Sequence, residues 1–209
     1  MRTGLLNPAT CLVNLSTCLA GLPTRPAGLL TRLCGLAICL VLASGSALAQ
    51  VPAEKPQPGP EHKRLGYFVG KWTTEGETKP NPFMPGGKML NHDTCEWFDG
   101  GFAVVCRSEG KGPMGPTKTI GIMGYSAEEK VYLYYGLDNS PMAMATVPRG
   151  TLNGGTWVYN DEAKMGGNSM KSRFTIKEIS PRAYTFKWEV LGEDGAWQAV
   201  FEGKSTKAS

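Results

Sequence analysis

The sequence has little of what enzymes and metal proteins commonly use. It holds only two histidines, His62 and His92, and it has no phosphate-binding glycine loop, nucleophile elbow or metal-spaced cluster. His92 precedes Asp93, but consecutive strand residues face opposite ways, so the pair is not expected to form one site. We expect His62 to brace the end of the fold. The sequence therefore predicts a protein that is not an enzyme, with no cofactor and no bound metal.

Acidic residues are missing from the first fifty positions, since the first one is Glu54. The apolar run Leu33 to Ala43 is too short to cross a bilayer, but it suits the core of a secretory signal. Ala47-Leu48-Ala49 then supplies the small residues that a signal peptidase reads. We predict cleavage near Ala49 and a periplasmic or secreted mature chain without a transmembrane anchor. The segment before the core is long for a signal, which leaves an over-extended reading frame as an open alternative.

Excess charge is also lacking once the predicted signal, residues 1–49, is removed. The predicted signal contains three of the 22 Lys and Arg residues and none of the 18 Asp and Glu residues. The rest of the chain is therefore nearly neutral. Nucleic-acid binding, which usually shows as a clustered basic face, is not expected. The remainder divides into a tether, 50–60, with four prolines in eleven residues, and one domain, 61–209.

From Trp72 onward, short segments rich in β-branched and aromatic residues alternate with Gly, Asn, Asp and Pro. No connection is long enough for a crossover helix, which excludes a parallel sheet. An all-β fold follows, and closure into an up-and-down antiparallel barrel would leave no exposed edge. The predicted strands are 71–79, 88–98, 102–109, 117–124, 130–137, 142–149, 155–160, 170–178, 182–191 and 196–204.

A short helix is expected just before the first strand. Pro60 suits its first turn, the apolar residues between 65 and 69 form one stripe, and Gly70 can end it with a left-handed conformation. A short helix with so small an apolar stripe must bury that stripe against another part of the fold. We therefore predict that the helix plugs one end of the barrel and that Trp72 points into the barrel there.

Cys95 and Cys106 flank Asp99-Gly100-Gly101, a strong hairpin signal. A two-residue turn at Gly100-Gly101 would place the cysteines directly opposite each other, which predicts a disulfide in an oxidising compartment. That turn would make them a hydrogen-bonded pair, a less comfortable site for a bridge, and a one-residue shift would move them onto a diagonal. The alternative is a pair of small buried thiols.

Several motifs occur in an order that resembles a known superfamily. His62 and Leu65 precede Gly70-Lys71-Trp72, a Gly100-Gly101 hairpin follows, and Gly124-Tyr125 ends a strand before Glu128-Glu129-Lys130. This order, between residues 61 and about 137, resembles the calycin superfamily of lipocalins, fatty-acid-binding proteins and nitrobindin-like barrels. It is most similar to a bacterial lipocalin-like family of unknown function. The resemblance implies a barrel that holds a small molecule.

Two departures limit what the resemblance implies. Many lipocalins stack an arginine from the last strand on the signature tryptophan, and this chain offers only Lys204 there, with Arg173 and Arg182 on earlier strands. Nitrobindin-like barrels bind haem through a histidine late in the chain. No histidine follows His92, so haem binding by that route is not supported.

The predicted function is non-catalytic binding of a small apolar or lipid-like ligand inside the barrel. One alternative is a filled barrel that binds a protein or envelope component, with Phe83, Met84 and Met114 as contacts. A smaller alternative is Cu(I) binding through the methionines, of which Met142 and Met144 would share a strand face. The inward positions predicted to line the ligand site are Trp72, Trp97, Met123, Tyr134, Met144, Trp157, Phe186 and Trp188.

Overall fold

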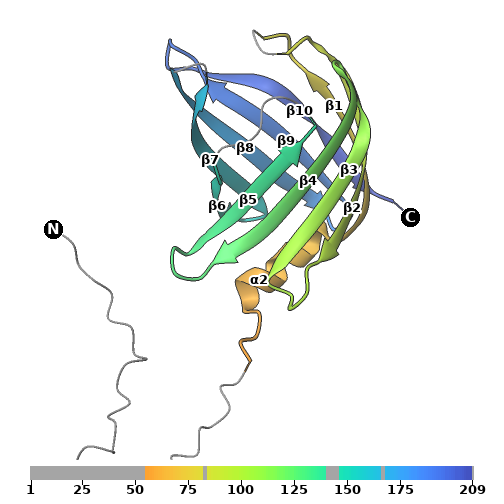
Figure 1. Cartoon of the computed structure of the whole chain (residues 1–209), viewed down its shortest axis with the longest axis vertical. Coiled ribbons are helices and arrows are strands. Elements are labelled where there is room, and N and C mark those ends of the chain that lie inside the picture. Colours follow the sequence, from red (N-terminus) through yellow and green to blue (C-terminus); the bar gives the residue numbers. More distant parts are fainter. Residues whose placement is uncertain (1–54, 82–83, 140–145, 166–167, 209) are drawn as a thin grey trace, which may run out of the picture. The chain divides into compact units, whose positions relative to one another are not determined.

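The computed structural model describes residues 55–81, 84–139, 146–165 and 168–208. The predicted signal and the first part of the tether lie outside these ranges. In the described part, ten antiparallel strands close into a barrel in which each strand pairs with its neighbours in the chain and β1 pairs with β10 (Figure 1). The predicted all-β barrel is confirmed. No helix among the described residues is long and apolar enough to cross a membrane.

The barrel strands follow one another along the chain with short connections. They are β1 Gly70–Thr78, β2 Gly87–Trp97, β3 Ala103–Gly112, β4 Gly115–Ser126, β5 Val131–Asp138, β6 Arg149–Asn153, β7 Thr156–Met165, β8 Asn168–Ser180, β9 Ala183–Leu191 and β10 Trp197–Lys207.

Nine of the predicted strands overlap observed ones over several residues, and the sixth prediction, 142–149, meets β6 at Arg149 alone among its described residues. Residues 146–148 are not strand, so the prediction is wrong there. Pro148 explains the difference, because a proline has no N–H to give to a ladder and is confined to edges and strand starts. Residues 142–145 of that prediction lie outside the described part of the chain.

The predicted plug is confirmed and consists of two short helical turns. An α-helix, α2 (Pro60–Arg64), continues as a 3₁₀ turn, η2 (Leu65–Phe68), and both lie at one end of the barrel (Figure 1). Leu65 and Phe68 are completely buried there. Gly70 follows with φ 129°, a conformation that disfavours any side chain.

Trp72 connects the plug to the barrel. It is 2% exposed, and its indole Nε1 donates a 2.7 Å hydrogen bond to the carbonyl oxygen of Phe68. The bond satisfies the one polar atom of an otherwise apolar side chain inside the core. A tryptophan just after a helix-ending glycine therefore fixes the angle at which the helical segment enters the barrel.

The hairpin between β2 and β3 carries the predicted disulfide, Cys95–Cys106, with a Cα–Cα distance of 4.0 Å. The turn is wider than two residues, because Phe98 N donates to Ala103 O and closes a four-residue loop. Counting back from that pair makes Cys95 and Cys106 a non-hydrogen-bonded pair, in which side chains lie closer together. The expected register is right, and the expected hydrogen-bonded phase is wrong.

Removing this bridge should lower stability. The bridge closes a loop of residues separated by 11 positions, for which chain entropy gives about 3 kcal/mol. The double variant Cys95→Ala/Cys106→Ala should lose about that free energy in urea unfolding. In reducing agent, the urea midpoint of the wild-type protein should fall towards that of the variant. A midpoint that changes neither with the double substitution nor with reduction would contradict the bridge.

Candidate functional site

The barrel interior has two unlike halves. The half next to the plug is filled by a core of interlocking rings and aliphatic side chains that has almost no exposed surface. Phe68 and Trp157 lie with ring centroids 5.1 Å apart, and Trp157 and Tyr132 lie 4.7 Å apart. Such contacts contribute dispersion and edge-to-face attraction beyond simple burial. This half leaves no room for a ligand.

An ion pair seals the same end. Arg64 of α2 forms a salt bridge with Glu178 of β8, and its guanidinium lies 5.4 Å from the centre of the Trp157 ring. Trp157 Nε1 donates to Glu178 as well, at 2.7 Å. His62 packs its ring against Phe102 and Tyr125. These contacts bind the helical segment to both sides of the barrel end.

Farther from the plug, glycines at inward positions hold aromatic rings of the core and of the chamber against the wall. A Cβ on Gly150 would lie 2.5 Å from the Tyr159 ring, and a Cβ on Gly203 would lie 2.6 Å from the Phe186 ring. On Gly121 it would lie 3.1 Å from the hydroxyl oxygen of a third ring, that of Tyr134. Glycine in a strand commonly marks such a close approach. The rings therefore lie along the wall, where larger residues would have pushed them to the centre.

Most other inward positions of this half carry small polar side chains. Thr74 donates to the carboxylate of Asp93 at 2.6 Å and shares a 2.7 Å hydrogen bond with Ser205. Thr117 donates to Asn91 at 2.8 Å across the β2 and β4 strands. Ten strands make a barrel wide enough to need bulky side chains if it is to be filled. We call this half, bounded by the inward residues Thr74, Asn91, Asp93, Ser108, Thr119, Tyr134, Asp161, Phe174, Trp188 and Phe201, the chamber.

Tyr134 faces the chamber from β5. Burial raises the pKa of its phenol to about 12, and the nearby carboxylates of Asp93 and Asp138 add to the shift. The residue as a whole is half-buried.

The wall is interrupted beside the chamber. β5 pairs with β6 only through Tyr132–Gly150 and Leu133–Arg149, and Tyr134 N then donates to Pro148 O at 3.2 Å. Near this seam lies a groove of about 690 Å³. Its lining combines outward and inward residues of β7 and β8 with residues of the preceding segment and Trp197; the lining residues are Thr146, Val147, Arg149, Asn160, Asp161, Glu162, Lys171, Ser172 and Trp197.

Comparison with known proteins agrees with this architecture. A family model described as a protein of unknown function, DUF1579, matches residues 57–207. The chain belongs to the DUF1579 family. No curated protein matches the sequence of this DUF1579 chain.

Two solved structures share the fold. The crystal structure of Rv2717c from M. tuberculosis superposes with a TM-score of 0.52 at 10% identity, over 72% of this chain and 99% of that chain. An S-type phycobiliprotein lyase, CPES from Guillardia theta, gives a TM-score of 0.50 at 11% identity, over 71% of this chain and 93% of that chain. At such low identity, the similarity of the DUF1579 chain to both structures concerns the fold.

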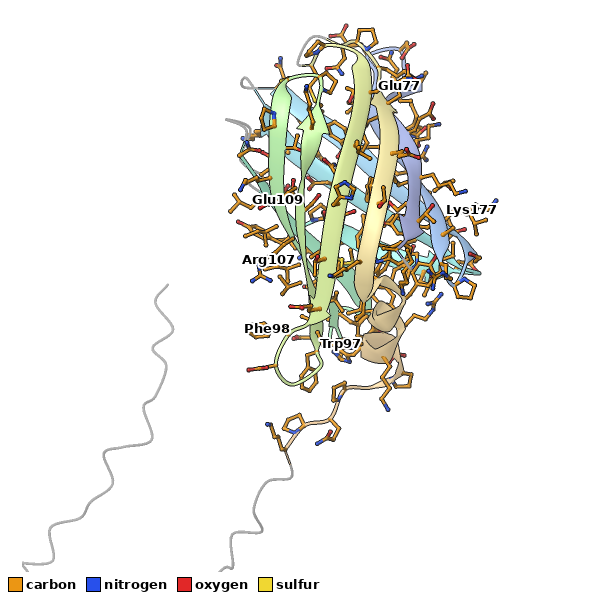
Figure 2. All side chains as sticks on the ribbon, turned by 90° about the vertical axis from the view of Figure 1, so that its right-hand side faces the viewer. Glu77, Trp97, Phe98, Arg107, Glu109 and Lys177 are labelled. Atoms are coloured by element: carbon orange, nitrogen blue, oxygen red, sulfur yellow. A yellow bond between two sulfur atoms is a disulfide. The ribbon has the colours of Figure 1, made fainter. Side chains whose placement is uncertain are left out.

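The residues predicted to line the site fall into different places. Tyr134 and Trp188 keep accessible surface in the chamber, and Met144 lies outside the described residues. Trp97 is 40% exposed at the plug end beside Gly66, where Figure 2 shows it next to the β2–β3 turn, so its prediction as a lining residue is wrong. Four others point inward and are only 0–7% exposed within the packed core, and as lining residues they stay predictions: Trp72, Met123, Trp157 and Phe186.

The sequence reading missed two features of the interior. A β-bulge between Ala199 and Phe201 turns the Phe201 ring inward, and its centroid lies 6.0 Å from that of Phe186. A cation does lie over the signature tryptophan, and it is Lys207 and not Lys204; its Nζ lies 4.8 Å from the centre of the Trp72 ring. Register decides this, because Lys207 is the direct partner of Trp72 in the β1–β10 ladder.

His92 and Asp93 face opposite ways, as predicted. His92 lies outside near Thr73, with Nδ1 at 3.5 Å from the hydroxyl oxygen, whereas Asp93 is inside the chamber. No group of three or more His, Cys, Asp or Glu side chains in the described part could hold a metal ion.

The raised pKa of Tyr134 gives a test of its surroundings. The neutral phenol is favoured in the folded state, so its contribution to stability is present below pH 10 and is lost as pH rises towards about 12. Between pH 10 and about 12, the free energy of unfolding of Tyr134→Phe should therefore fall by about 2 kcal/mol less than that of the wild type. Urea unfolding at a series of alkaline pH values measures this. The variant Tyr135→Phe, which changes the outward ring beside it, is the control, and parallel curves for the wild type and Tyr134→Phe would contradict the placement.

Proposed function

We propose that this DUF1579 protein is a secreted, non-catalytic barrel that binds a small apolar or lipid-like molecule in the chamber. The observation that carries the proposal is the contrast between the two halves of the interior. The core beside the plug is completely buried, whereas the inward rings of Tyr134, Phe174, Trp188 and Phe201, three of which pack against that core, are only half-buried. Apolar rings with accessible surface inside a barrel are the usual lining of a small-molecule site.

The arrangement of these rings supports binding of an apolar body. Tyr134 and Phe174 lie with centroids 6.2 Å apart, Phe174 and Phe201 are 6.1 Å apart, and Trp188 and Phe201 are 5.4 Å apart. The rings come from β5, β8, β9 and β10 and form one continuous apolar wall. A molecule that covers this wall gains roughly 25 cal/mol for each Å² of apolar surface removed from water.

Other evidence supports the proposal less directly. The ordered motifs around Gly70-Lys71-Trp72 resemble those of calycins, a superfamily with many small-molecule carriers. One of the solved structures with this fold is called a lyase, but a shared fold does not transfer an activity. A non-catalytic role is supported by the position of His92, which lies on the outer face and away from the chamber.

The chamber can be tested by filling it. Ser108 faces inward on β3 and its neighbour Arg107 faces outward, as Figure 2 shows for the arginine. Ser108→Phe should weaken binding of the neutral apolar dye N-phenylnaphthylamine by about tenfold or more, because the new ring occupies chamber space. Fluorescence titration measures the affinity, and Arg107→Phe, which adds the same ring outside, should bind the dye like the wild type.

A second candidate function is protein binding by the outer face of β4 and β5. Four apolar side chains lie there in two cross-strand pairs, Ile120–Leu137 and Ile122–Tyr135, each side chain 39–45% exposed. Of the loop residues predicted for such contacts, Met114 is 59% exposed and Phe83 lies outside the described residues. Under this alternative the interior is not used, and Ser108→Phe would bind the dye no less well than Arg107→Phe.

Export and a native ligand can be measured together. Expressed as the full chain in a bacterium, the protein should be recovered from the periplasm with the mass of a chain beginning at Gln50. Native mass spectrometry without detergent should also show an adduct that solvent extraction removes. Retention of residues 1–49 on a cytoplasmic protein would contradict the proposed secretion.

A further inference from the structure

Among the described residues, one buried side-chain polar atom has no hydrogen-bond partner, and it is the hydroxyl of Tyr159 on β7. The residue is only 1% exposed. By contrast, the indole nitrogens of Trp72 and Trp157 in the same core each donate to a protein oxygen at 2.7 Å. A buried phenol without a partner has lost its hydrogen bonds to water and gained none in return. The Tyr159 hydroxyl therefore lacks the acceptor that both tryptophans have.

Tyr159 belongs to the same row of inward residues as the apolar wall of the chamber. Phe174 is its direct partner in the β7–β8 ladder, Trp188 is the partner of Phe174, and Phe201 is the partner of Trp188. These three rings are half-buried, whereas Tyr159 is enclosed at the β7 end of the row. The residue with the unpartnered hydroxyl therefore stands at one end of the surface that is proposed to hold the ligand.

The Tyr159 side chain is directed across β6 towards β5. Its ring lies over Gly150 of β6, where a Cβ would come within 2.5 Å of it, and its centroid is 5.8 Å from that of Tyr134 on β5. Burial raises the pKa of the Tyr159 phenol, and the neighbouring phenols of Tyr134 and Tyr132 add to the shift. The hydroxyl therefore lies near Tyr134, which bounds the chamber.

The surroundings of this hydroxyl favour an uncharged partner. A phenol has one proton to donate, and donation requires an acceptor atom. Burial raises the pKa of the Tyr134 phenol as well, to about 12, so these surroundings disfavour a negative charge on either ring. A carboxylate brought there would lose its hydration in the same way. A carbonyl oxygen accepts a hydrogen bond and carries no net charge.

We propose that the ligand carries an uncharged acceptor oxygen, such as that of a ketone or an ester, on its apolar body, and that Tyr159 donates a hydrogen bond to this oxygen. The inference rests on the proposed function and specifies the class of molecule. The apolar body covers Phe174, Trp188 and Phe201, and the oxygen lies at the β7 end of that row. Free fatty acids, which are ionised at neutral pH, lie outside this class.

Three probes with a naphthalene body test this. Acetylnaphthalene has the acceptor oxygen, isopropenylnaphthalene has the same planar shape with a CH₂ group in place of that oxygen, and naphthoate carries a negative charge. Each probe competes with N-phenylnaphthylamine bound to the full chain, and the loss of dye fluorescence gives its affinity. Naphthoate should bind about tenfold or more weakly than acetylnaphthalene, because its carboxylate must lose its hydration.

Tyr159→Phe removes the hydroxyl and keeps the ring. It should weaken acetylnaphthalene by about three- to tenfold and leave isopropenylnaphthalene unchanged within about twofold. The hydroxyl has no protein partner to lose, so the urea midpoint of this variant should not fall. Tyr67→Phe is the matched control, because the Tyr67 hydroxyl at the plug lies 2.9 Å from the carbonyl oxygens of Ser180 and Ala183. It should lower the urea midpoint and leave all three affinities unchanged.

The outcomes separate the two proposals. If both neutral probes compete but Tyr159→Phe weakens them equally or not at all, the hydrogen bond is wrong and the binding function stands. A naphthoate affinity equal to that of acetylnaphthalene would overturn the uncharged class. A urea midpoint of Tyr159→Phe that falls as far as that of Tyr67→Phe would show that the hydroxyl has a partner in the protein, which also overturns the inference. If neither the dye nor any probe binds, the binding function is wrong and the inference fails with it.

Discussion

The hydrogen bond from Trp72 to the carbonyl of Phe68 is the contact on which the rest of the interior depends. It fixes a helical segment of two short turns across one end of a ten-stranded barrel, where Leu65 and Phe68 become completely buried. A segment with so few turns has little stability of its own, so tertiary packing must supply it. The Arg64–Glu178 ion pair and the Lys207 cation over the Trp72 ring hold the same segment from the opposite strands. One end of the barrel is thus closed by a single, well-connected cluster.

Closure of one end of the barrel by the plug goes with a different composition of inward side chains in the other half. The completely buried large side chains gather beside the plug, and the far half of the wall combines glycine, serine, threonine, asparagine and aspartate with the half-buried rings of Tyr134, Phe174, Trp188 and Phe201. Inward glycines let the rings of Tyr134, Tyr159 and Phe186 lie along neighbouring strands. The stability of the fold and the space for a ligand therefore come from different parts of one barrel. This division also explains why lining residues cannot be recognised by their apolar character alone.

Local patterns could be predicted where a rule of period or turn chemistry applies. The transition from helix to strand at Gly70-Lys71-Trp72 and the disulfide across the Gly100-Gly101 hairpin could be predicted, because each depends on residues close in the sequence. The predicted strand was wrong at residues 146–148, because Pro148 has no N–H to donate to a neighbouring strand. Trp97 has the inward parity of Cys95 and is nevertheless 40% exposed, because its strand ends at the rim.

What the sequence determined by itself is therefore the class of fold, the plug and the disulfide, all of which follow from spacing along the chain. Only the tertiary structure decided which inward residues are packed and which are accessible. That distinction depends on closure between β1 and β10, the bulge at Ala199 and Phe201, and the end at which the helical segment lies.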